Sequence, residues 1–382
     1  QPTQSTKRHV LGRRTGRSIF QSPMSQSNVT ERVVVAILNW NGLHHLQTYL
    51  PQVILNCKGD ADVAVIDNGS SDESVVWCTQ NYPEVQVVRL ENNLGFSGGY
   101  NAGLAQIQAK TFVLLNSDVR TTNHWIPPVL DMMKSEGYVA CQPLILNDSD
   151  NELFEYAGAA GGHIDKNGYT FCAGRIFEVF ESNHGQYAQN REVFWASGAA
   201  LFIDSQAFHA VGGLDVDFFA HMEEIDLCWR LKNRGYRVGV CGSSIVYHLG
   251  GGTLQKVSPF KTYLNFRNNL FLLVKNHHRV ALIPMLIERM TLDGVAAFKF
   301  LSEGSFHLFL AVAKAHRDFY KSFRKMRNKR KLELAATSTD LPTHRSPNYC
   351  GWYHRSIVWD YFILKKQVFQ DLESDHFEAS RD

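Results

Sequence analysis

Short apolar runs that alternate with helical patterns constrain the fold of this chain more than any other feature. Val33–Leu38 is a continuous apolar run, as expected for a strand buried on both faces. The same signature recurs at residues 62–66, 85–90 and 112–115, and helices are expected between these strands at 43–54, 70–80 and 100–110. Strands and helices that alternate with short links predict an α/β fold, with a mostly parallel sheet flanked by helices.

Each of the four expected strands ends in a cluster of polar residues. The clusters begin at Asn39, Asp67, Asn92 and Asn116. In parallel α/β sheets, ligands bind beyond the carboxyl ends of the strands. One polar strand end is usually only a turn, but four along the same edge are hard to explain as turns alone. We therefore expect a binding site at this edge.

The second half of the chain is less regular. Residues 147–195 are rich in Gly, Asn and aromatic residues, which indicates short strands and loops lying over the site. A further strand is expected at 198–203, and a helix at 223–234 that Gly235 closes. A last strand at 237–247 ends at His248.

Composition excludes several classes of protein. With 44% hydrophobic and 20% charged residues, the 382-residue chain has a globular profile. A net charge of only +2 argues against a nucleic-acid-binding protein. The seven cysteines form no CxxC pair, which argues against a zinc knuckle or a disulfide scaffold and favours a reducing, cytoplasmic compartment.

Composition also divides the chain into three expected parts. Residues 1–32 are basic and polar with no apolar run, which predicts a disordered tail without a secretion signal. Residues 33–270 carry the α/β pattern, and residues 271–382 form a helical extension. No uncharged stretch in this extension reaches the ~20 apolar residues that a membrane span needs.

The extension carries nine Lys/Arg and one Asp between residues 314 and 331. An apolar helical region that runs into a basic helix predicts association with an anionic membrane surface, on the cytoplasmic face. The aromatic segment at 349–369 is expected to belong to the same surface. The alternative is a solvated helix face, or helices packed on the main domain.

A candidate metal site begins at Asp118, a carboxylate near the end of the fourth strand. Mg²⁺ and Mn²⁺ prefer hard oxygen ligands and bridge naturally to a diphosphate. One carboxylate cannot form such a site alone, so a second ligand is needed. His248, at another strand end, is a candidate partner, although a lone histidine is often structural.

The acidic cluster Glu223, Glu224 and Asp226 supplies candidates for a general base. Carboxylates at a helix start are also stabilised by the helix dipole, so these residues can be simple end charges. An internal Asp226–Arg230 pair is the structural alternative for the third carboxylate. The sequence alone leaves open which of the three is the base.

Other common site motifs are absent from the sequence or ambiguous. The glycine-rich segment at 95–103 matches neither a dinucleotide fingerprint nor a P-loop. There is no GxSxG and no HExxH, which argues against the common hydrolases. Asp67 can accept hydrogen bonds from a ribose or a base, or it can form an Asx turn at the next helix.

Five ordered motifs between residues 33 and 270 resemble the family 2 glycosyltransferases, which have the GT-A fold. The motifs are Ile37–Gly42, Val65–Asp72, Asn93–Asn101, Leu114–Asp118 and Glu223–Arg230. The segment Thr262–Asn269 further resembles the bacterial rhamnosyltransferase-like branch.

The resemblance implies a role for each matching residue. Asp118 and His248 would bind Mg²⁺ or Mn²⁺ on the donor diphosphate, and Glu224 would be the catalytic base, with Glu223 or Asp226 as alternatives. Nucleotide binding is assigned to residues at the strand ends and in the loops that follow them: Asn39, Asn41, Asp67, Asn93, Gly95, Asn101 and Asn116. Trp195 and Arg267 are assigned to the acceptor side.

Two departures from the family pattern affect these assignments. Asn116 replaces the first Asp of the DxD motif, which predicts weaker metal affinity or a greater share of the binding by His248. Glu224 replaces an Asp and is one methylene longer.

The implied activity is an inverting, metal-dependent transfer of a sugar, with rhamnose as a candidate, from a nucleoside diphosphate to a hydroxyl group. The acceptor would be a saccharide or lipid-linked saccharide in cell-surface polysaccharide synthesis. One alternative is a sugar nucleotidyltransferase, which needs a basic phosphate loop after the first strand, where this chain has Asn39–His45. The other is a non-catalytic, membrane-associated scaffold of the same fold.

Overall fold

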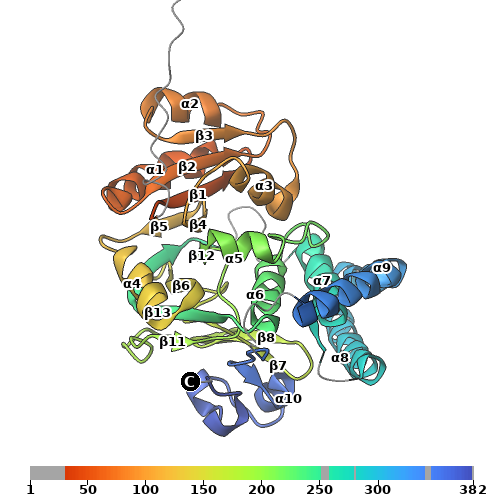
Figure 1. The fold of residues 1–382 in the computed structure, drawn as a ribbon. Coiled ribbons are helices and arrows are strands. Elements are labelled where there is room, and N and C mark those ends of the chain that lie inside the picture. The colour runs from red at the N-terminus through yellow and green to blue at the C-terminus, as the bar shows by residue number, and fades with distance from the viewer. Residues whose placement is uncertain (1–30, 251–257, 279–280, 340–345, 381–382) are drawn as a thin grey trace, which may run out of the picture.

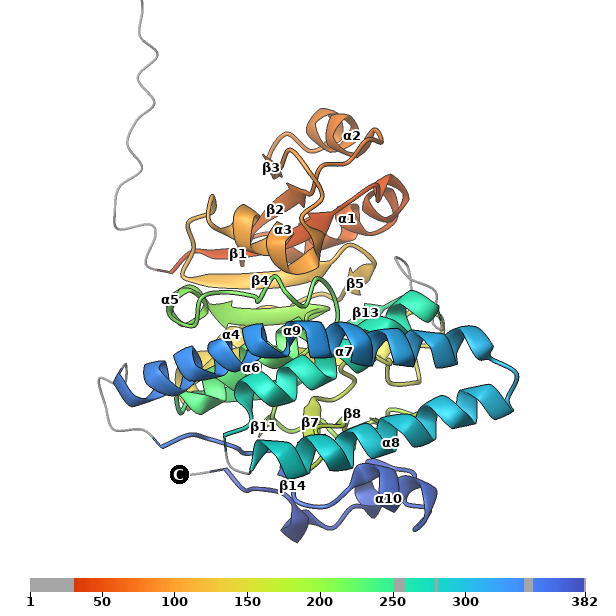
Figure 2. The same cartoon turned by 90° about the vertical axis from the view of Figure 1, so that its right-hand side faces the viewer.

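The computed structural model describes residues 31–250, 258–278, 281–339 and 346–380. The expected tail at 1–32 therefore lies almost entirely outside the described residues. Within the described ranges, the chain forms a nine-stranded main sheet with helices on both faces, a smaller five-stranded sheet and a group of C-terminal helices (Figures 1 and 2).

The main sheet is mostly parallel, as predicted. Eight of its strands lie in the order β11 (Arg191–Glu192), β13 (Arg237–His248), β6 (Tyr138–Asn147), β12 (Ala200–Asp204), β4 (Thr111–Asn116), β1 (Val33–Asn39), β2 (Asp62–Asp67) and β3 (Gln86–Arg89). The ninth strand, β5 (Val119–Thr121), pairs with β13. Strands β3, β2, β1, β4, β6 and β13 all point the same way, because the antiparallel β12 lies between β4 and β6. The predicted α/β fold class is confirmed.

Helices cover both faces of this sheet and explain why its strands are apolar throughout. On β1, Val35 and Ile37 pack on one side with α1 (Leu43–Cys57) and α4 (Pro127–Glu136). Val34 and Ala36 pack on the other side. That side is covered by α3 (Gly95–Leu104), α5 (Ser205–Ala210), α6 (Glu223–Asn233) and α7 (Pro259–Asn276). Helix α2 (Ser74–Asn81) starts four residues later than expected.

The expected helix at 100–110 is misplaced, because α3 begins at Gly95 and ends at Leu104. The side chain of Asn93 accepts a hydrogen bond from Gly95 N–H at 2.8 Å, which stabilises this early start. Gly103 lets the helix lie directly on the sheet, since a side chain there would come within 2.5 Å of Ile66. Close packing thus outweighs the low helix propensity of glycine.

The strands of the second sheet come from the irregular region at 147–195 and from the C-terminal part of the chain. Its order is β10 (Val179–Phe180), β9 (Arg175–Ile176), β8 (Thr170–Cys172), β7 (Gly162–Asp165) and β14 (Trp352–Tyr353). The chain thus returns at β14, which pairs in parallel with β7. Helix α10 (Ile357–Phe362) and two 3₁₀ turns, Phe369–Asp371 and Ser374–His376, follow.

Two long helices form most of the remaining extension, α8 (Leu282–Ser302) and α9 (Phe306–Thr339). Helix α9 packs along α7, and its Lys325 and Lys329 lie 2.5 Å from carboxylate oxygens of Asp217 and Asp215. Part of the basic segment is therefore packed on the main domain. Helix α7 is continuous across residue 270, and the division there stays a prediction. No helix in the described ranges is long and apolar enough to cross a bilayer.

Candidate active site

The carboxyl ends of β1, β2 and β4 meet at one edge of the main sheet. Asn39 lies opposite Asp67, and Asn116 lies opposite the preceding residue of β1. Asn39 Nδ2 lies 3.4 Å from Asp67 Oδ1, whereas Asn39 Oδ1 is buried without a hydrogen-bond partner. Gly42 leaves room for this oxygen, because a side chain there would come within 2.5 Å of it. An unpartnered acceptor at this edge suits a ligand N–H or hydroxyl group.

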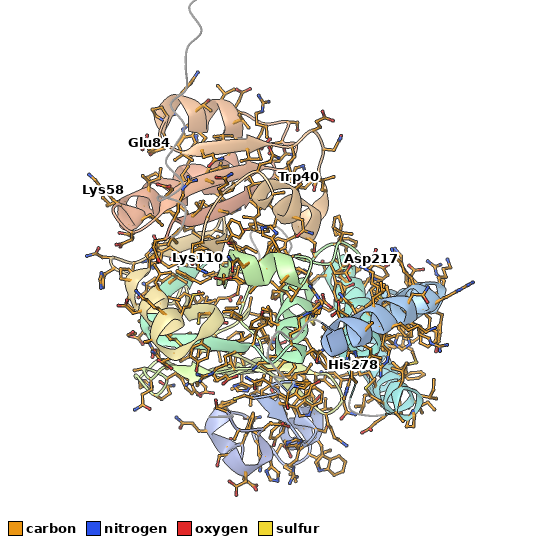
Figure 3. All side chains as sticks on the ribbon, in the orientation of Figure 1. Trp40, Lys58, Glu84, Lys110, Asp217 and His278 are labelled. Atoms are coloured by element: carbon orange, nitrogen blue, oxygen red, sulfur yellow. The ribbon has the colours of Figure 1, made fainter. Side chains whose placement is uncertain are left out.

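The loops that follow these strands are held by their own side chains. Ser70 N–H donates to Asp67 at 3.2 Å, which is the Asx-type contact of the structural alternative. Ser71 N–H donates to Asn41 Oδ1 at 2.8 Å. Trp40, between Asn39 and Asn41, is 48% exposed and projects at this edge in Figure 3. The assignment of these residues to nucleotide binding stays a prediction.

A buried charged corner forms where β4, β5 and β13 meet. His248 pairs with Val119 in the β13–β5 ladder, which brings its ring beside Asp118. His248 Nε2 lies 3.1 Å from Asp118 Oδ1 and 3.4 Å from Asn116 Nδ2. The structure thus brings together the two predicted metal ligands and the asparagine of the altered DxD motif.

Glu155 is a member of this corner that sequence reasoning missed. It is buried, and its Oε2 lies 3.3 Å from His248 Nδ1, on the far side of the ring from Asp118. The backbone N–H of Glu155 donates a hydrogen bond to the carbonyl of Ile145 at 3.1 Å, which holds the Glu155 backbone against β6. No motif marks Glu155, since it lies in the irregular region and only the tertiary fold brings it to His248.

The two carboxylates control the charge of His248. Burial alone would lower the pKa of His248, but Glu155 and Asp118 outweigh it and raise that pKa to about 10. Burial alone would raise the pKa of Asp118 and of Glu155. Contact with His248 outweighs this effect, so the pKa of each carboxyl is lowered. A metal ion that used His248 would therefore have to displace a proton.

The residues of this corner fit a divalent ion that is shared with a substrate. Mg²⁺ and Mn²⁺ are commonly held by one or two carboxylates together with phosphate oxygens. Asp118 and His248 offer one oxygen and one nitrogen 3.1 Å apart, and Glu155 lies behind the imidazole as carboxylates often do at metal sites. Across the described ranges, no group of three or more His, Cys, Asp or Glu could hold an ion alone. The other ligands would have to come from the substrate.

The second acidic group starts α6. Glu223 is buried, whereas Glu224 is partly exposed, and each has one carboxylate oxygen that is buried without a partner. A side-chain carbon on Gly198 would lie 3.5 Å from Glu224 Cβ. The neighbouring Ala199 carbonyl accepts a hydrogen bond from Asn116 N–H at 3.0 Å. Glu224 and Asn116 therefore lie beside consecutive residues, Gly198 and Ala199, and the Asn116 side chain is next to His248.

Burial makes both carboxyl groups hard to ionise. It raises the pKa of Glu224 to about 7, against the lowering effect of backbone N–H groups at the helix start. Burial, and then the charge of Glu224, raise the pKa of Glu223 well above its usual range. A carboxyl group whose pKa is near neutrality is suited to general base catalysis.

A strained loop sets the position of these carboxylates. Phe219, His221 and Met222 all have φ between 66° and 72°, the left-handed region that costs L-residues roughly 1–2 kcal/mol each. Asn268 compensates by donating from Nδ2 to three carbonyls of this loop, at 2.8–2.9 Å. Asn268 is a second residue whose role the sequence did not reveal, although it lies in the motif Thr262–Asn269.

The third candidate base, Asp226, lies in a buried ion-pair network, which argues against a role as general base. It is fully buried and contacts Arg230, Lys275 and Asn276, each at 2.8 Å. The Asp226–Arg230 pair that was the structural alternative is therefore present. Residues two apart do not share a face of a helix, so α6 directs Asp226 away from Glu224 and into the core.

Three other predicted site residues are occupied by contacts within the protein. The carboxamide of Asn101 bonds to both N–H and C=O of Leu214, at 2.9 and 2.7 Å. Trp195 Nε1 donates to the His163 carbonyl at 2.9 Å. The Arg267 guanidinium donates to carbonyls of the strained loop at 3.1–3.2 Å and lies over aromatic rings. Their direct contact with substrate stays a prediction.

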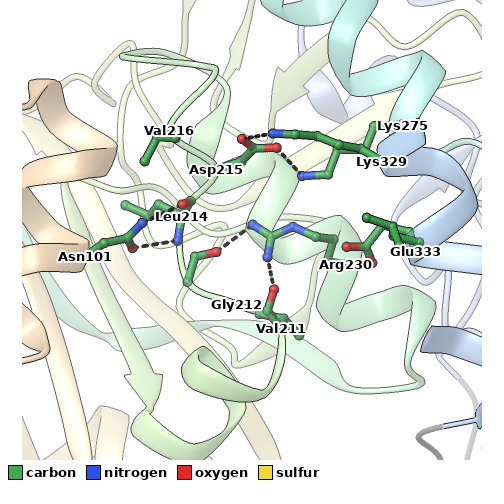
Figure 4. A pocket seen from close by; sticks show the side chains of 12 residues that line it. Asn101, Val211, Gly212, Leu214, Asp215, Val216, Arg230, Lys275, Lys329 and Glu333 are labelled. Carbon is green, nitrogen blue, oxygen red and sulfur yellow. Dashed lines mark hydrogen bonds and ion pairs between the residues drawn. The ribbon is translucent and has the colours of Figure 1, made fainter. Parts of the chain in front are cut away.

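A cavity of about 350 Å³ lies between the loop at 211–216 and α9, away from the His248 corner. Figure 4 shows Lys275 and Lys329 converging on Asp215 there, and Arg230 donating to loop carbonyls. Because these three cations already pair with groups of the protein, we do not interpret the cavity as an anion-binding site.

Parts of the chain are similar in sequence to known glycosyltransferases. Residues 34–196 match the family model described as glycosyl transferase family 2. The low-salt glycan biosynthesis hexosyltransferase Agl10 of Haloferax volcanii is 23% identical over 248 residues, which cover 64% of this chain and 76% of the relative. The N-acetylglucosaminyl-diphospho-decaprenol L-rhamnosyltransferase of Mycobacterium tuberculosis is 24% identical over 242 residues, which cover 59% and 78%.

A solved structure shares the fold. The crystal structure of GalNAc-T7 with UDP, GalNAc and Mn²⁺ superposes with a TM-score of 0.52 at 16% identity, covering 83% of this chain and 58% of that one. The predicted GT-A fold is confirmed. The helices that were expected in the C-terminal extension of this chain are also present, as α8, α9 and α10.

Proposed function

We propose that this chain, which is similar to glycosyl transferase family 2 over residues 34–196, transfers a sugar from a nucleoside diphosphate to an acceptor hydroxyl, with inversion at the anomeric carbon. One observation carries this proposal, the placement of two acidic groups on either side of the consecutive residues Gly198 and Ala199. One group, Asp118 with His248, suits a diphosphate, and the other, Glu223 with Glu224, suits proton transfer.

In the proposed reaction, Glu224 removes the proton from the acceptor hydroxyl. The hydroxyl oxygen attacks the anomeric carbon, the bond from that carbon to the diphosphate oxygen breaks, and the nucleoside diphosphate leaves. A single displacement inverts the anomeric configuration. Asp118 and His248 would hold a divalent ion, which when bound neutralises charge on the leaving diphosphate.

The donor is a nucleoside diphosphate hexose, with Asp67 and Asn39 on the nucleoside side. The GalNAc-T7 structure holds UDP and Mn²⁺, which supports a diphosphate donor and a divalent ion. The mycobacterial relative is named for rhamnosyl transfer to a lipid-linked sugar. We therefore take rhamnose as the first donor sugar to test and a lipid-linked saccharide at the cytoplasmic membrane face as the acceptor, in cell-surface polysaccharide synthesis.

The test measures thermal stability with UDP-, dTDP- and GDP-sugars, each with Mn²⁺, Mg²⁺ or EDTA. One nucleotide is expected to stabilise the protein by about 2.7 kcal/mol at a hundredfold excess over its Kd. EDTA is expected to remove most of this gain, and so is Asp118→Asn, because a neutral amide is a weaker metal ligand than a carboxylate. The nucleotide that responds identifies the donor base.

Exposed Asp150→Asn is the matched control and should respond as the wild type does. Stabilisation that persists in EDTA would show that Asn116 has made the site independent of metal. If no nucleotide stabilises the protein and no donor is turned over, the chain is the non-catalytic scaffold instead. The anomeric configuration of the product, read by NMR, tests inversion.

Glu155→Gln should weaken Mn²⁺ binding by roughly 10- to 100-fold, the usual effect of losing a carboxylate behind a metal-bound histidine. The reason is that the neutral amide no longer polarises the imidazole from its Nδ1 side. Titration of Mn²⁺ followed by electron paramagnetic resonance, with nucleotide present, measures this affinity. Exposed Glu152→Gln, three residues away, should bind Mn²⁺ normally. Equal affinity in both variants would limit Glu155 to a structural role.

A further inference from the structure

Helix α8 has an exposed apolar side in addition to the side that it buries against the protein. Its exposed side is apolar: Ile283, Ile287, Val295 and Phe298 are 58–67% exposed, and Leu301 is 40% exposed. Its buried side carries Met285, Leu286 and Ala297 together with a charged pair, Arg289 and Asp293. Such an arrangement is unfavourable in water unless the outer side is covered, since soluble helices bury their apolar face.

Contacts from three other elements prevent α8 from rotating to bury its apolar side. Arg289 lies 2.9 Å from Asp293 and stacks 3.8 Å above the ring of Tyr169, in the β7–β8 turn. The Arg289 guanidinium also bonds to Asn269 of α7. From α9, His316 reaches Asp293 at 3.1 Å. The exposed apolar side is therefore fixed by a satisfied polar network.

The same surface continues onto neighbouring elements. On α10 and just after it, Trp359, Phe362, Ile363 and Leu364 are 41–56% exposed. Lys299 of α8 lies 6.0 Å from the ring of Phe362, and α8 and α10 run side by side in Figure 2. Phe306 and Leu310, 56% and 48% exposed, extend the surface onto the start of α9. We call the exposed apolar residues of α8, the start of α9 and the α10 region the outer apolar face.

The charge next to this face is positive. Residues 281–330 contain ten Lys/Arg and four Asp/Glu. Arg317, Lys321 and Arg324 are exposed and follow Phe306 and Leu310 at helical spacing, so they lie on the same side of α9. The exposed carboxylates of α8, Glu288 and Glu303, lie 3.2 and 3.5 Å from Lys166 and Lys299. Asp318 lies 3.0 Å from Arg317 and 3.8 Å from Lys321, so one acid is shared between two of these cations, and the cations still exceed the acids over residues 281–330.

We propose that the outer apolar face lies on an anionic bilayer, with its apolar side chains at the boundary of headgroups and acyl chains and Arg317, Lys321 and Arg324 on the headgroups. A second copy of the chain fits less well, because a two-fold contact would set the same cations against one another. This inference deepens the proposed function, since it names the surface that would hold the enzyme at a lipid-linked acceptor. Binding alone tests it, so its failure is separable from that of the transfer chemistry.

The test is flotation of the full chain with vesicles of phosphatidylcholine, with and without 30% phosphatidylglycerol. The wild type should float with the anionic vesicles, and less so at high salt. Ile287→Ser with Phe298→Ser should reduce partitioning by roughly 10- to 100-fold, because two inserted side chains are lost. Leu55→Ser with Val76→Ser, exposed apolar residues of α1 and α2, is the matched control and should float normally.

Arg317→Glu with Lys321→Glu should abolish the preference for anionic vesicles. All variants should keep the nucleotide-dependent thermal shift, which shows that they fold and separates docking from donor binding. No flotation of the wild type, or equal flotation of the two serine double variants, overturns the proposal. So does a dimer in sedimentation that the Ile287/Phe298 variant abolishes, because the occupant is then a second copy.

Discussion

Glu224→Gln is expected to reduce kcat for sugar transfer by about 10²- to 10⁴-fold, the usual contribution of a general base. Gln keeps the shape of Glu224 but cannot accept the acceptor proton. Donor affinity should change little, because Glu224 has no contact with Asp118 or His248. Steady-state kinetics with the donor identified by thermal shift, together with nucleotide titration, measure the two effects separately.

The pH dependence of sugar transfer and of stability tests the role of Glu224 in a second way. With the pKa of Glu224 raised to about 7 in the protein without substrate, kcat/KM should rise with pH up to about 7 and then level off. Stability should have the opposite slope. The native state holds a proton that the unfolded chain releases near pH 4.5, so stability falls as pH rises from about 4.5 to 7. The Gln variant should lack this loss and melt no lower than the wild type at pH 8.

Glu223→Gln is the matched control, since Glu223 is the neighbouring carboxylate and is more deeply buried. It should keep most of the activity. If Glu223→Gln abolishes transfer while Glu224→Gln does not, the base is Glu223. If both retain activity within tenfold of the wild type, neither carboxylate is the base, and the proposed mechanism fails.

Asp226→Asn is expected to destabilise the fold by about 3–5 kcal/mol, because it removes one member of a buried charged group. Arg230 and Lys275 would keep their positive charges in a site that is 0–4% exposed. In a chain of this size the melting temperature should fall by roughly 4–6 °C. Differential scanning calorimetry and urea unfolding measure the loss.

Asp62→Asn is the control for this substitution. Asp62 also pairs with an arginine, Arg32 at 2.7 Å, but its side chain is 61% exposed. Such surface pairs contribute only about 0–1 kcal/mol. Equal stability of the two variants would show that the Asp226 network adds no more than a surface pair. A folded Asp226→Asn protein with normal stability and no activity would restore Asp226 as a catalytic candidate.

Some of the site could be predicted because strand periodicity is local. Val33–Asn39 and Thr111–Asn116 are buried on both faces, so their apolar runs are unambiguous, and parallel pairing brings their polar ends to one edge. The start of α3 could not be predicted in this way. Its glycines favour a loop by propensity, and only the contact of Gly103 with Ile66 explains the helix.

The sequence alone therefore determined the sheet, the edge that carries the polar residues and the identity of Asp118, His248 and Glu224 as candidates, because these follow from periodicity and short motifs. The tertiary structure decided what depends on distant contacts. It brought Glu155 to His248, used Asn268 to hold the strained loop before α6 and placed Asp226 in the core. It also turned the apolar side of α8 outward, because the buried contacts of Arg289 and Asp293 come from three other parts of the chain.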